Sequence, residues 1–198
     1  MSDLSRPVRR LRMTLERKRE LYETVMGLVR EVGYDALTMD AVAARAQLSK
    51  ATIYRLWSGK PELVASALRE NKAVRVGEVD TGSLSGDLHE IVRRISDHSA
   101  QDASVLRGLG LAAQRDPALG SALRESLIEP EVGALRLMLA RALARGELDE
   151  DRPATAFLPQ VMLGAVIARP LLEDRPADAA YLAQFVDAMV LPALGLSS

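Results

Sequence analysis

Apolar residues recur along the first part of the chain with the three- and four-residue spacing of an α-helix. Between Thr14 and Val32 they fall on one helical face, at Tyr22, Val25, Met26 and Val29. Gly33 follows, and glycine readily takes the left-handed conformation that ends many helices. The pattern therefore predicts a first helix over 14–32 that stops at Gly33.

Two short helices are predicted next, separated by a tight connection at Gln47 and Leu48. Thr38 is a suitable N-cap for a helix over 39–46, and Ser49 is one for a helix over 50–57. Asp40 stands near the positive end of the first of these. Its inward face is formed by Val42, Ala43 and Ala46. The pattern indicates two short helices packed across a turn.

The remainder of the chain also has helical periodicity, and we find no convincing strand. Pro61 suits the first turn of a fourth helix that runs toward Val76, and residues 80–87 (DTGSLSGD) are typical of a linker. Pro130 should kink or split the longest later segment. The further helices are expected at about 85–101, 102–115, 118–145, 153–173 and 178–194. We therefore predict an all-α protein with domains at 14–76 and 84–198.

The outward face of the helix over 50–57 is suited to the major groove of DNA. On a helical wheel Ile53, Leu56 and Trp57 point inward, whereas Ala51 and Arg55 point outward with Thr52 and Tyr54 beside them. A guanidinium can donate two hydrogen bonds to guanine, and an alanine methyl can meet a thymine methyl. Hydroxyl groups and the Lys60 ammonium can hold phosphates. The helix starts at Thr38 and Lys60 add backbone N–H groups that favour anions.

Charge and composition agree with this interpretation. Residues 1–60 carry twelve Lys and Arg against seven Asp and Glu, a net charge of +5, so the remainder carries −6. A basic segment beside an acidic body is expected where only one of them meets a polyanion. The N-terminal residues have no apolar run of a signal peptide, and no stretch reaches roughly 18 uninterrupted apolar residues, so we expect a cytoplasmic protein.

Two other classes of function were weighed. The acidic run at 147–151 follows Gly146 without a histidine nearby, and the chain has no cysteine, no phosphate-binding glycine loop and no nucleophile elbow. Solvated loop charge explains the run better than catalysis, so we expect neither an enzyme nor a metal or cofactor site. A helical module that binds only protein would leave the outward face of residues 50–55 unexplained.

The stretch VREVGYDALTMDAVAARAQLSKATIYRLWSGKPEL resembles the DNA-binding domain of the TetR family of transcriptional repressors over about fifty residues. The resemblance implies a three-helix helix-turn-helix domain, a larger ligand-binding and dimerisation domain, and a homodimer on a palindromic operator. It also implies DNA-binding roles for Thr38, Ser49, Lys50, Ala51, Thr52, Tyr54, Arg55 and Lys60, with phosphate contacts at Thr38, Tyr54 and Lys60. Trp57 stands where the family usually has phenylalanine, and Gln47 and Ala51 stand where glycine is frequent.

The later stretches DTGSLSGDL, RDPAL, ARGELDED and FVDAMVLPAL are similar to one branch of the family's regulatory domains. In that branch a ligand binds among the middle helices, and the last two helices form a four-helix bundle with the partner subunit. This implies a small-molecule effector of unknown identity. Its candidate contacts are His98, Arg107, Leu109, Leu111, Gln114, Leu135, Met138, Leu139, Phe157 and Met162. For any single one of these, ordinary core packing is the alternative.

Two further surfaces are predicted from the residues themselves. Apolar residues in the last two helices exceed what one small domain needs on a single face, which favours a dimer over simple core. The expected interface contains Leu158, Val161, Gly164, Ala165, Phe185 and Met189. The arginine-rich N-terminal tail is either a basic arm for the minor groove or a solvated tail, with Arg6, Arg9, Arg10 and Arg12 as its cations.

Overall fold

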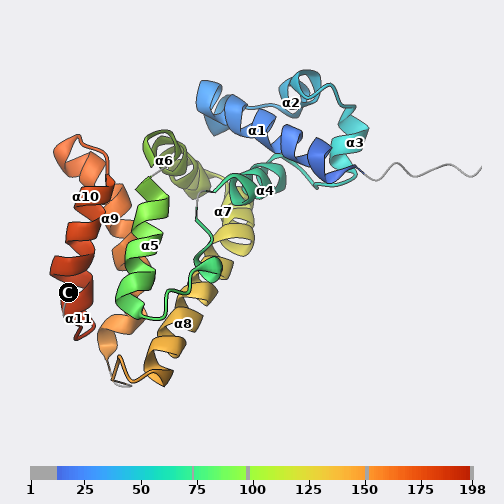
Figure 1. Ribbon diagram of the computed structural model, residues 1–198. Coiled ribbons are helices and arrows are strands. Elements are labelled where there is room, and N and C mark those ends of the chain that lie inside the picture. The colour runs from blue at the N-terminus through green and yellow to red at the C-terminus, as the bar shows by residue number, and fades with distance from the viewer. Residues whose placement is uncertain (1–12, 73, 97–98, 150–151, 197–198) are drawn as a thin grey trace, which may run out of the picture.

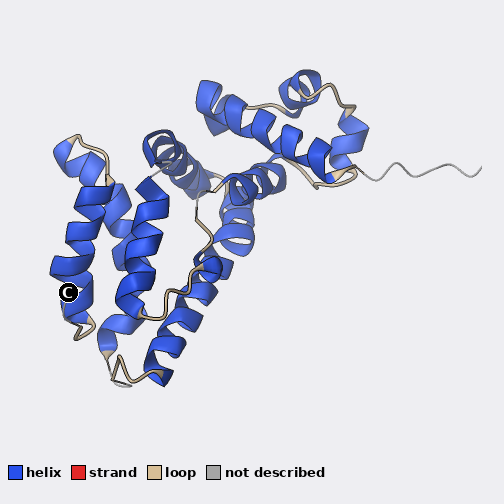
Figure 2. Ribbon diagram, in the orientation of Figure 1, coloured by secondary structure: helices blue, strands red, loops and turns tan. Residues whose placement is uncertain are grey.

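The computed structural model describes residues 13–72, 74–96, 99–149 and 152–196. Every regular element within these ranges is helical, as Figure 2 shows, which confirms the predicted all-α class. Four N-terminal helices form a small domain at one end, and the remaining helices form a larger body (Figure 1). The outermost layer of the body, far from the small domain, contains α9 and α10.

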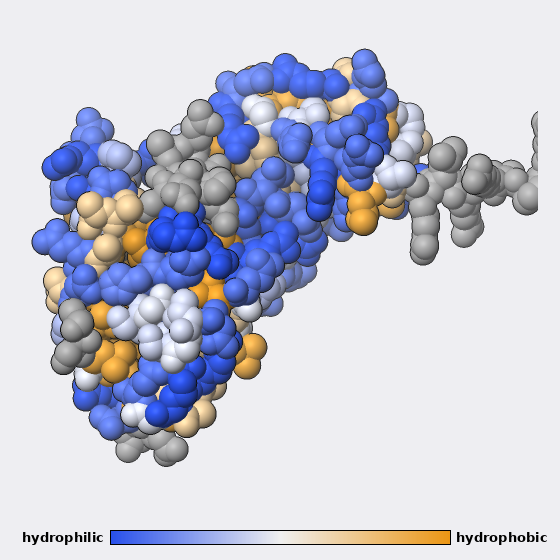
Figure 3. Space-filling view, viewed as in Figure 1, coloured by the Kyte–Doolittle hydropathy of each residue, from blue (hydrophilic) through white to orange (hydrophobic). Residues whose placement is uncertain are grey.

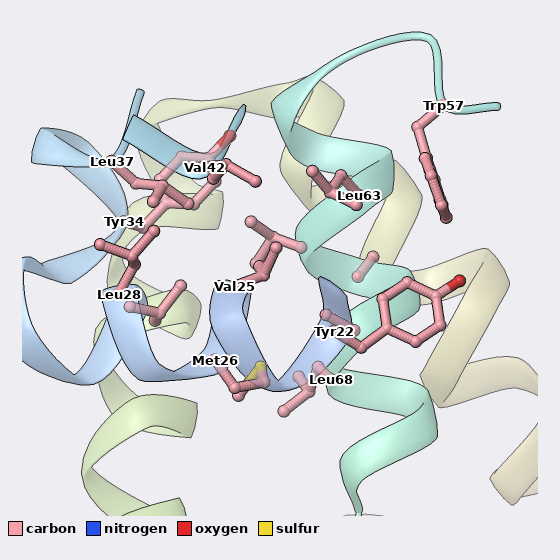
Figure 4. Close-up of a cluster of buried hydrophobic side chains, with 14 of the residues drawn as sticks. Tyr22, Val25, Met26, Leu28, Tyr34, Leu37, Val42, Trp57, Leu63 and Leu68 are labelled. Atoms are coloured by element: carbon pink, nitrogen blue, oxygen red, sulfur yellow. The ribbon is translucent and has the colours of Figure 1, made fainter. Parts of the chain in front are cut away.

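The small domain consists of α1 Leu15–Ala36, α2 Met39–Arg45, α3 Lys50–Tyr54 and α4 Lys60–Asn71. Thr14 caps α1 by accepting a hydrogen bond from the Arg17 amide, and Gly33 (φ 77°) breaks the helix one turn before its end. The break at Gly33 follows the sequence prediction. Buried residues from α1, α2 and α4 meet in one cluster, in which Tyr22, Val25, Met26 and Leu63 are prominent (Figure 4).

Within the described ranges, the larger body is built from seven helices and four helical turns. Its elements are η1 Val76–Glu78, α5 Leu84–Ser96, α6 Ser99–Arg115, α7 Pro117–Leu123, η2 Arg124–Ile128, α8 Glu129–Ala144, η3 Pro153–Phe157, α9 Leu158–Glu173, α10 Ala179–Phe185, η4 Val186–Val190 and α11 Leu191–Ala193. The expected split of the long segment near Pro130 is confirmed, because the π-type turn η2 separates α7 from α8 just before this proline.

The hydrophobic core of the small domain does not end at the linker predicted over 80–87. Residues of α6 and α7 belong to the same buried cluster as α1 and α4, namely Val105, Leu109, Ala112, Leu119 and Leu123. A second cluster joins α5, α8 and α9 to the last helices. The corner between α6 and α7 is therefore packed onto the small domain rather than onto the rest of the body.

Several predicted boundaries are wrong by half a turn or more. The third helix ends at Tyr54 instead of Trp57, and Leu56, expected to point inward, is 43% exposed. The chain leaves the helix there and buries the Trp57 ring, which lies edge-on to Tyr22 with 5.7 Å between ring centroids. The fourth helix ends at Asn71 because Lys72 turns extended. Leu84, placed in the linker, begins α5.

Candidate nucleic-acid interface

The turn between α2 and α3 sets the angle at which α3 meets the surface. Gln47 has φ 52°, a left-handed conformation that a residue with a Cβ rarely adopts. The Leu48 amide donates to the Ala43 carbonyl oxygen at 3.0 Å and closes the turn. Gln47, which stands where the resembled family frequently has glycine, therefore takes a conformation that glycine would adopt without strain.

A serine cap starts α3 and two buried side chains hold it. The Ser49 hydroxyl accepts a hydrogen bond from the Thr52 amide at 3.1 Å, as predicted for an N-cap. Ile53 has no exposed surface and Trp57 is 4% exposed, so both belong to the core of the small domain. Ile53 and Trp57 therefore anchor α3 to the core of the small domain, and the opposite side of the helix faces solvent.

The outward face of α3 is the one that the sequence predicted. Ala51 and Arg55 are exposed, Tyr54 is 50% exposed, and Thr52 lies partly buried at the edge. Within the described ranges, the Arg55 guanidinium makes no ion pair or hydrogen bond with the protein. A planar five-donor group beside a small methyl side chain is suited to the edges of bases. Hydrophilic residues dominate the visible face of the small domain (Figure 3).

Two of the predicted phosphate contacts, Thr38 and Lys60, and the predicted DNA-binding residue Lys50 lie around α3. The Thr38 hydroxyl accepts from the Ala41 amide at 3.1 Å and caps α2. Lys50 forms an ion pair with Asp40 of α2. The Lys60 ammonium donates to the Tyr34 carbonyl oxygen at 3.1 Å and stands 4.2 Å from the centroid of the Tyr34 ring. All three side chains lie on the small domain, and two of them are held by groups of α1 or α2.

The Glu62 carboxylate stabilises the loop between α3 and α4. The Ser58 amide and hydroxyl donate to the same Glu62 oxygen at 2.7 and 2.8 Å. These two hydrogen bonds hold the pKa of Glu62 below its usual range. The loop thus keeps Lys60 at the start of a helix, next to the residues of α3.

Sequence reasoning missed a polar cluster that joins this interface to the larger body. The Tyr34 hydroxyl donates to Asp116 Oδ2 at 2.7 Å, and Arg115 pairs with Asp35 at 2.6 Å. No local pattern marks Tyr34 and Asp116 as partners, because 82 positions separate them.

The structure does not bring all the predicted effector contacts together. Leu109 lies in the core shared with α1, whereas Leu135, Met138 and Leu139 are buried in the second core. The others within the described residues are exposed or partly buried, namely Arg107, Leu111, Gln114, Phe157 and Met162, and His98 lies outside them. A cavity of about 580 Å³ lies between α1 and α6, and Leu109 is the one predicted contact among its lining residues.

The predicted dimer residues divide into two groups. Leu158 and Ala165 are buried within the protomer, and Phe185 packs against the same core. Val161 and Gly164 on α9 are exposed, and so is Met189. The apolar surface on α9 also includes residues not predicted, Leu163, Ile167, Leu171 and Leu172. The segment Pro153–Glu173 contains the charged Arg169, but by length and composition alone it is long and apolar enough to cross a membrane.

Comparison with known proteins matches both the small domain and the larger body to described families. Residues 21–67 match the sequence model described as "Bacterial regulatory proteins, tetR family", and residues 78–189 match "Tetracyclin repressor-like, C-terminal domain". The uncharacterized HTH-type transcriptional regulator Rv1556 of Mycobacterium tuberculosis is 34% identical over 182 residues, covering 92% of this chain and 90% of that one.

Two further proteins extend the comparison. The DNA-binding transcriptional repressor TetR of Mycobacteroides abscessus is 36% identical over 168 residues, covering 83% of this chain and 86% of its own. The crystal structure of the TetR family transcription regulator SCO0332 superposes with a TM-score of 0.66 at 26% identity, over 88% of this chain and 97% of that one.

Proposed function

The chain belongs to the TetR family of bacterial DNA-binding transcriptional regulators, which are not enzymes, and we propose that it is a ligand-responsive repressor. In this proposal a cytoplasmic homodimer binds a palindromic operator and a small molecule releases it. The observation that carries the DNA-binding part is the outward face of α3, where Ala51, Tyr54 and Arg55 are all exposed. Arg55 and Ala51 read base edges, whereas Thr38, Tyr54 and Lys60 hold phosphates.

The exposed apolar surface of α9 supports the homodimer. Leu163, Leu171 and Leu172 are 51%, 81% and 80% exposed, more than a stable protomer leaves on one helix unless another surface covers it. Met189 on η4 is 59% exposed as well. A second copy of the same surface would bury these side chains in a four-helix bundle. Two-fold symmetry would then place two α3 helices over two half-sites of a palindrome.

The effector acts, in this proposal, by favouring one of two arrangements of the larger body. The α6–α7 corner shares a core with α1 and α4, so a shift of the body is transmitted to the small domain. Entry of a ligand would swing α4 and change the spacing of the two α3 helices. Release follows only if the ligand binds the operator-free arrangement more tightly. A ligand with equal affinity for free and operator-bound protein would refute this part.

The DNA-binding proposal is tested by titrating a labelled duplex from upstream of the protein's own gene at two salt concentrations. We expect two protomers per palindromic site and an affinity that falls steeply as salt rises. Arg55→Ala should weaken specific binding by about tenfold or more, since a bidentate base contact contributes about 1–3 kcal/mol. The matched control is Arg136→Ala, which removes the same charge from an exposed position of α8. Equal affinity of both variants would contradict the docking of α3.

The dimer is tested by sedimentation at micromolar concentration. Val161→Glu places a charge on the exposed surface of α9, where Val161 is 39% exposed, and should shift the protein toward monomer. The control is Leu137→Glu, since Leu137 is 67% exposed on α8 away from that surface. A wild-type monomer, or a Val161→Glu dimer as stable as the control, would defeat the proposed interface.

The arginine-rich tail, outside the described residues, enters the proposal as a minor-groove arm. Deletion of residues 1–12 should then lower the slope of log affinity against log salt, because each phosphate-neutralising cation contributes about 0.9 to that slope. An unchanged slope would mean that the tail makes no contact with DNA.

A further inference from the structure

The Lys60 ammonium is held by a single residue of α1. Its Nζ atom donates to the Tyr34 carbonyl oxygen at 3.1 Å and lies over the Tyr34 ring, 4.2 Å from the centroid. A cation above an aromatic face is attracted to it, and the carbonyl supplies a second fixed partner. Both contacts of the ammonium are therefore made by Tyr34, one through its backbone and one through its ring.

Tyr34 is held in turn by the larger body. The side chain is 5% exposed, and its hydroxyl donates to Asp116 Oδ2 at 2.7 Å. Asp116 is the N-cap of α7, where its other carboxylate oxygen accepts from the amides of Ala118 and Leu119. The three residues form a chain of contacts from the start of α4, through the end of α1, to the α6–α7 corner.

The pKa shifts of Tyr34 and Asp116 have these same contacts among their causes. Burial first, and then the bond to Asp116, raise the pKa of Tyr34 well above its usual value. The hydrogen bond from Tyr34 is the main cause that lowers the pKa of Asp116, and the charge of Lys60 adds to it. The neighbouring pair Arg115–Asp35 is about 70% exposed on both sides, so it contributes little by comparison.

Beside this chain of contacts the packing is incomplete. The cavity of about 580 Å³ between α1 and α6 is lined by Val29, Gly33 and Tyr34 on one side and by Val105, Gly108 and Leu109 on the other. Close-packed interiors resist displacement, whereas an open space next to a contact lets one element shift against another. This space lies between the end of α1 that carries Tyr34 and residues 104–109 of α6, the helix that leads into the α6–α7 corner.

We propose that Tyr34 is a positioning residue for the phosphate contact of Lys60, and that its hydroxyl ties this contact to Asp116 at the α6–α7 corner. The inference rests on the proposed phosphate contact of Lys60. When the corner is seated on α1, the bond to Asp116 fixes the ring, and the ring and carbonyl hold the ammonium at the start of α4. When the corner moves, the ring is released and the ammonium loses its fixed position.

The test is a double-mutant cycle on operator binding by the full-length dimer. Tyr34→Phe keeps the ring and the backbone carbonyl but deletes the bond to Asp116. We expect it to lower operator affinity by about threefold or more, and to reduce the salt slope toward that of Lys60→Ala. In the Lys60→Ala background the same substitution should have no further effect, because its action passes through Lys60.

Two results would overturn the inference. One is an unchanged affinity for Tyr34→Phe, and the other is an equal loss in both backgrounds, which a purely structural role predicts. Lys60→Ala alone tests the proposed function separately. If its affinity and salt slope equal those of the wild type, the phosphate contact itself is wrong and the inference falls with it.

A second variant removes the contact between Tyr34 and Asp116 by changing the residue of the larger body. Asp116→Ser removes the carboxylate oxygen that accepts from the Tyr34 hydroxyl but keeps a side chain that caps helices as well as aspartate does. We expect the same loss of affinity as for Tyr34→Phe, without addition in the double variant. The control Asp35→Asn breaks only the exposed pair with Arg115 and should leave affinity unchanged. Wild-type affinity for a folded Asp116→Ser protein would also overturn the inference.

Discussion

Thr38 has two tasks that one pair of substitutions separates, because its hydroxyl caps α2 and is also proposed to hold a phosphate. The hydroxyl accepts from the Ala41 amide at 3.1 Å. Ser83 makes an equivalent contact at the start of α5, where its hydroxyl accepts from the Gly86 amide at 3.1 Å. Ser83→Ala is therefore a matched control, since it deletes a cap of the same geometry in the part of the chain that does not approach DNA.

Both substitutions should cost similar stability and differ only in operator binding. Loss of a hydroxyl cap costs about 1 kcal/mol, which lowers the melting temperature of a chain of this size by about 2–4 °C. A hydrogen bond to a charged group contributes about 1.5–3 kcal/mol. Two protomers then lose about 3 kcal/mol or more in Thr38→Ala, which is roughly a hundredfold rise in Kd.

The assay is fluorescence anisotropy of a labelled operator at fixed salt, with thermal unfolding followed by circular dichroism. Thr38→Ser keeps the hydroxyl and should retain most of both properties. Equal operator affinity for Thr38→Ala and Ser83→Ala, at equal loss of stability, would show that Thr38 only caps α2. A Thr38→Ser protein as weak as Thr38→Ala would refute the role of the hydroxyl.

Three further predictions concern stability. Ile53→Ala, at a site with no exposed surface, should cost about 2–5 kcal/mol in urea unfolding, and a loss below 1 kcal/mol would mean that α3 is not anchored there. At both Gly33 and Gly27 an added Cβ would meet no atom within 4 Å, so the two sites differ only in backbone conformation. Gly33→Ala should lower the melting temperature because φ is 77° there. Gly27→Ala lies in the regular part of α1 and should raise the melting temperature, because alanine favours helix more than glycine does. Stability should also fall in acid: the folded pKa values of several carboxyl groups lie below their unfolded values of about 4–4.5, so their contribution is complete above that range and is lost as pH decreases through the folded values. The melting temperature between pH 7 and pH 3 measures this, and a flat profile would contradict the hydrogen bonds of Glu62, Glu90, Asp116, Glu147 and Asp178.

The candidate interface was largely predictable because its features are local. Caps at Thr38 and Ser49, the break at Gly33 and the outward face of α3 depend on residues within four positions of one another. Their chemistry is set by the backbone groups that each side chain can reach. The boundary errors have a different origin. The end of α3 depends on where the Trp57 ring is buried, and that site lies against Tyr22 of another helix.

The sequence by itself determined the helical class, the order of the helices and the side of α3 that faces a partner, because helical periodicity and capping act over a few residues. The tertiary structure decided which helices share a core and what holds Lys60. An apolar stripe shows that a face is covered but carries no information on what covers it, so the union of α6 and α7 with the small domain could not be predicted. The contact of Tyr34 with Asp116 joins residues 82 positions apart, and only the packing of α1 against the α6–α7 corner brings them together.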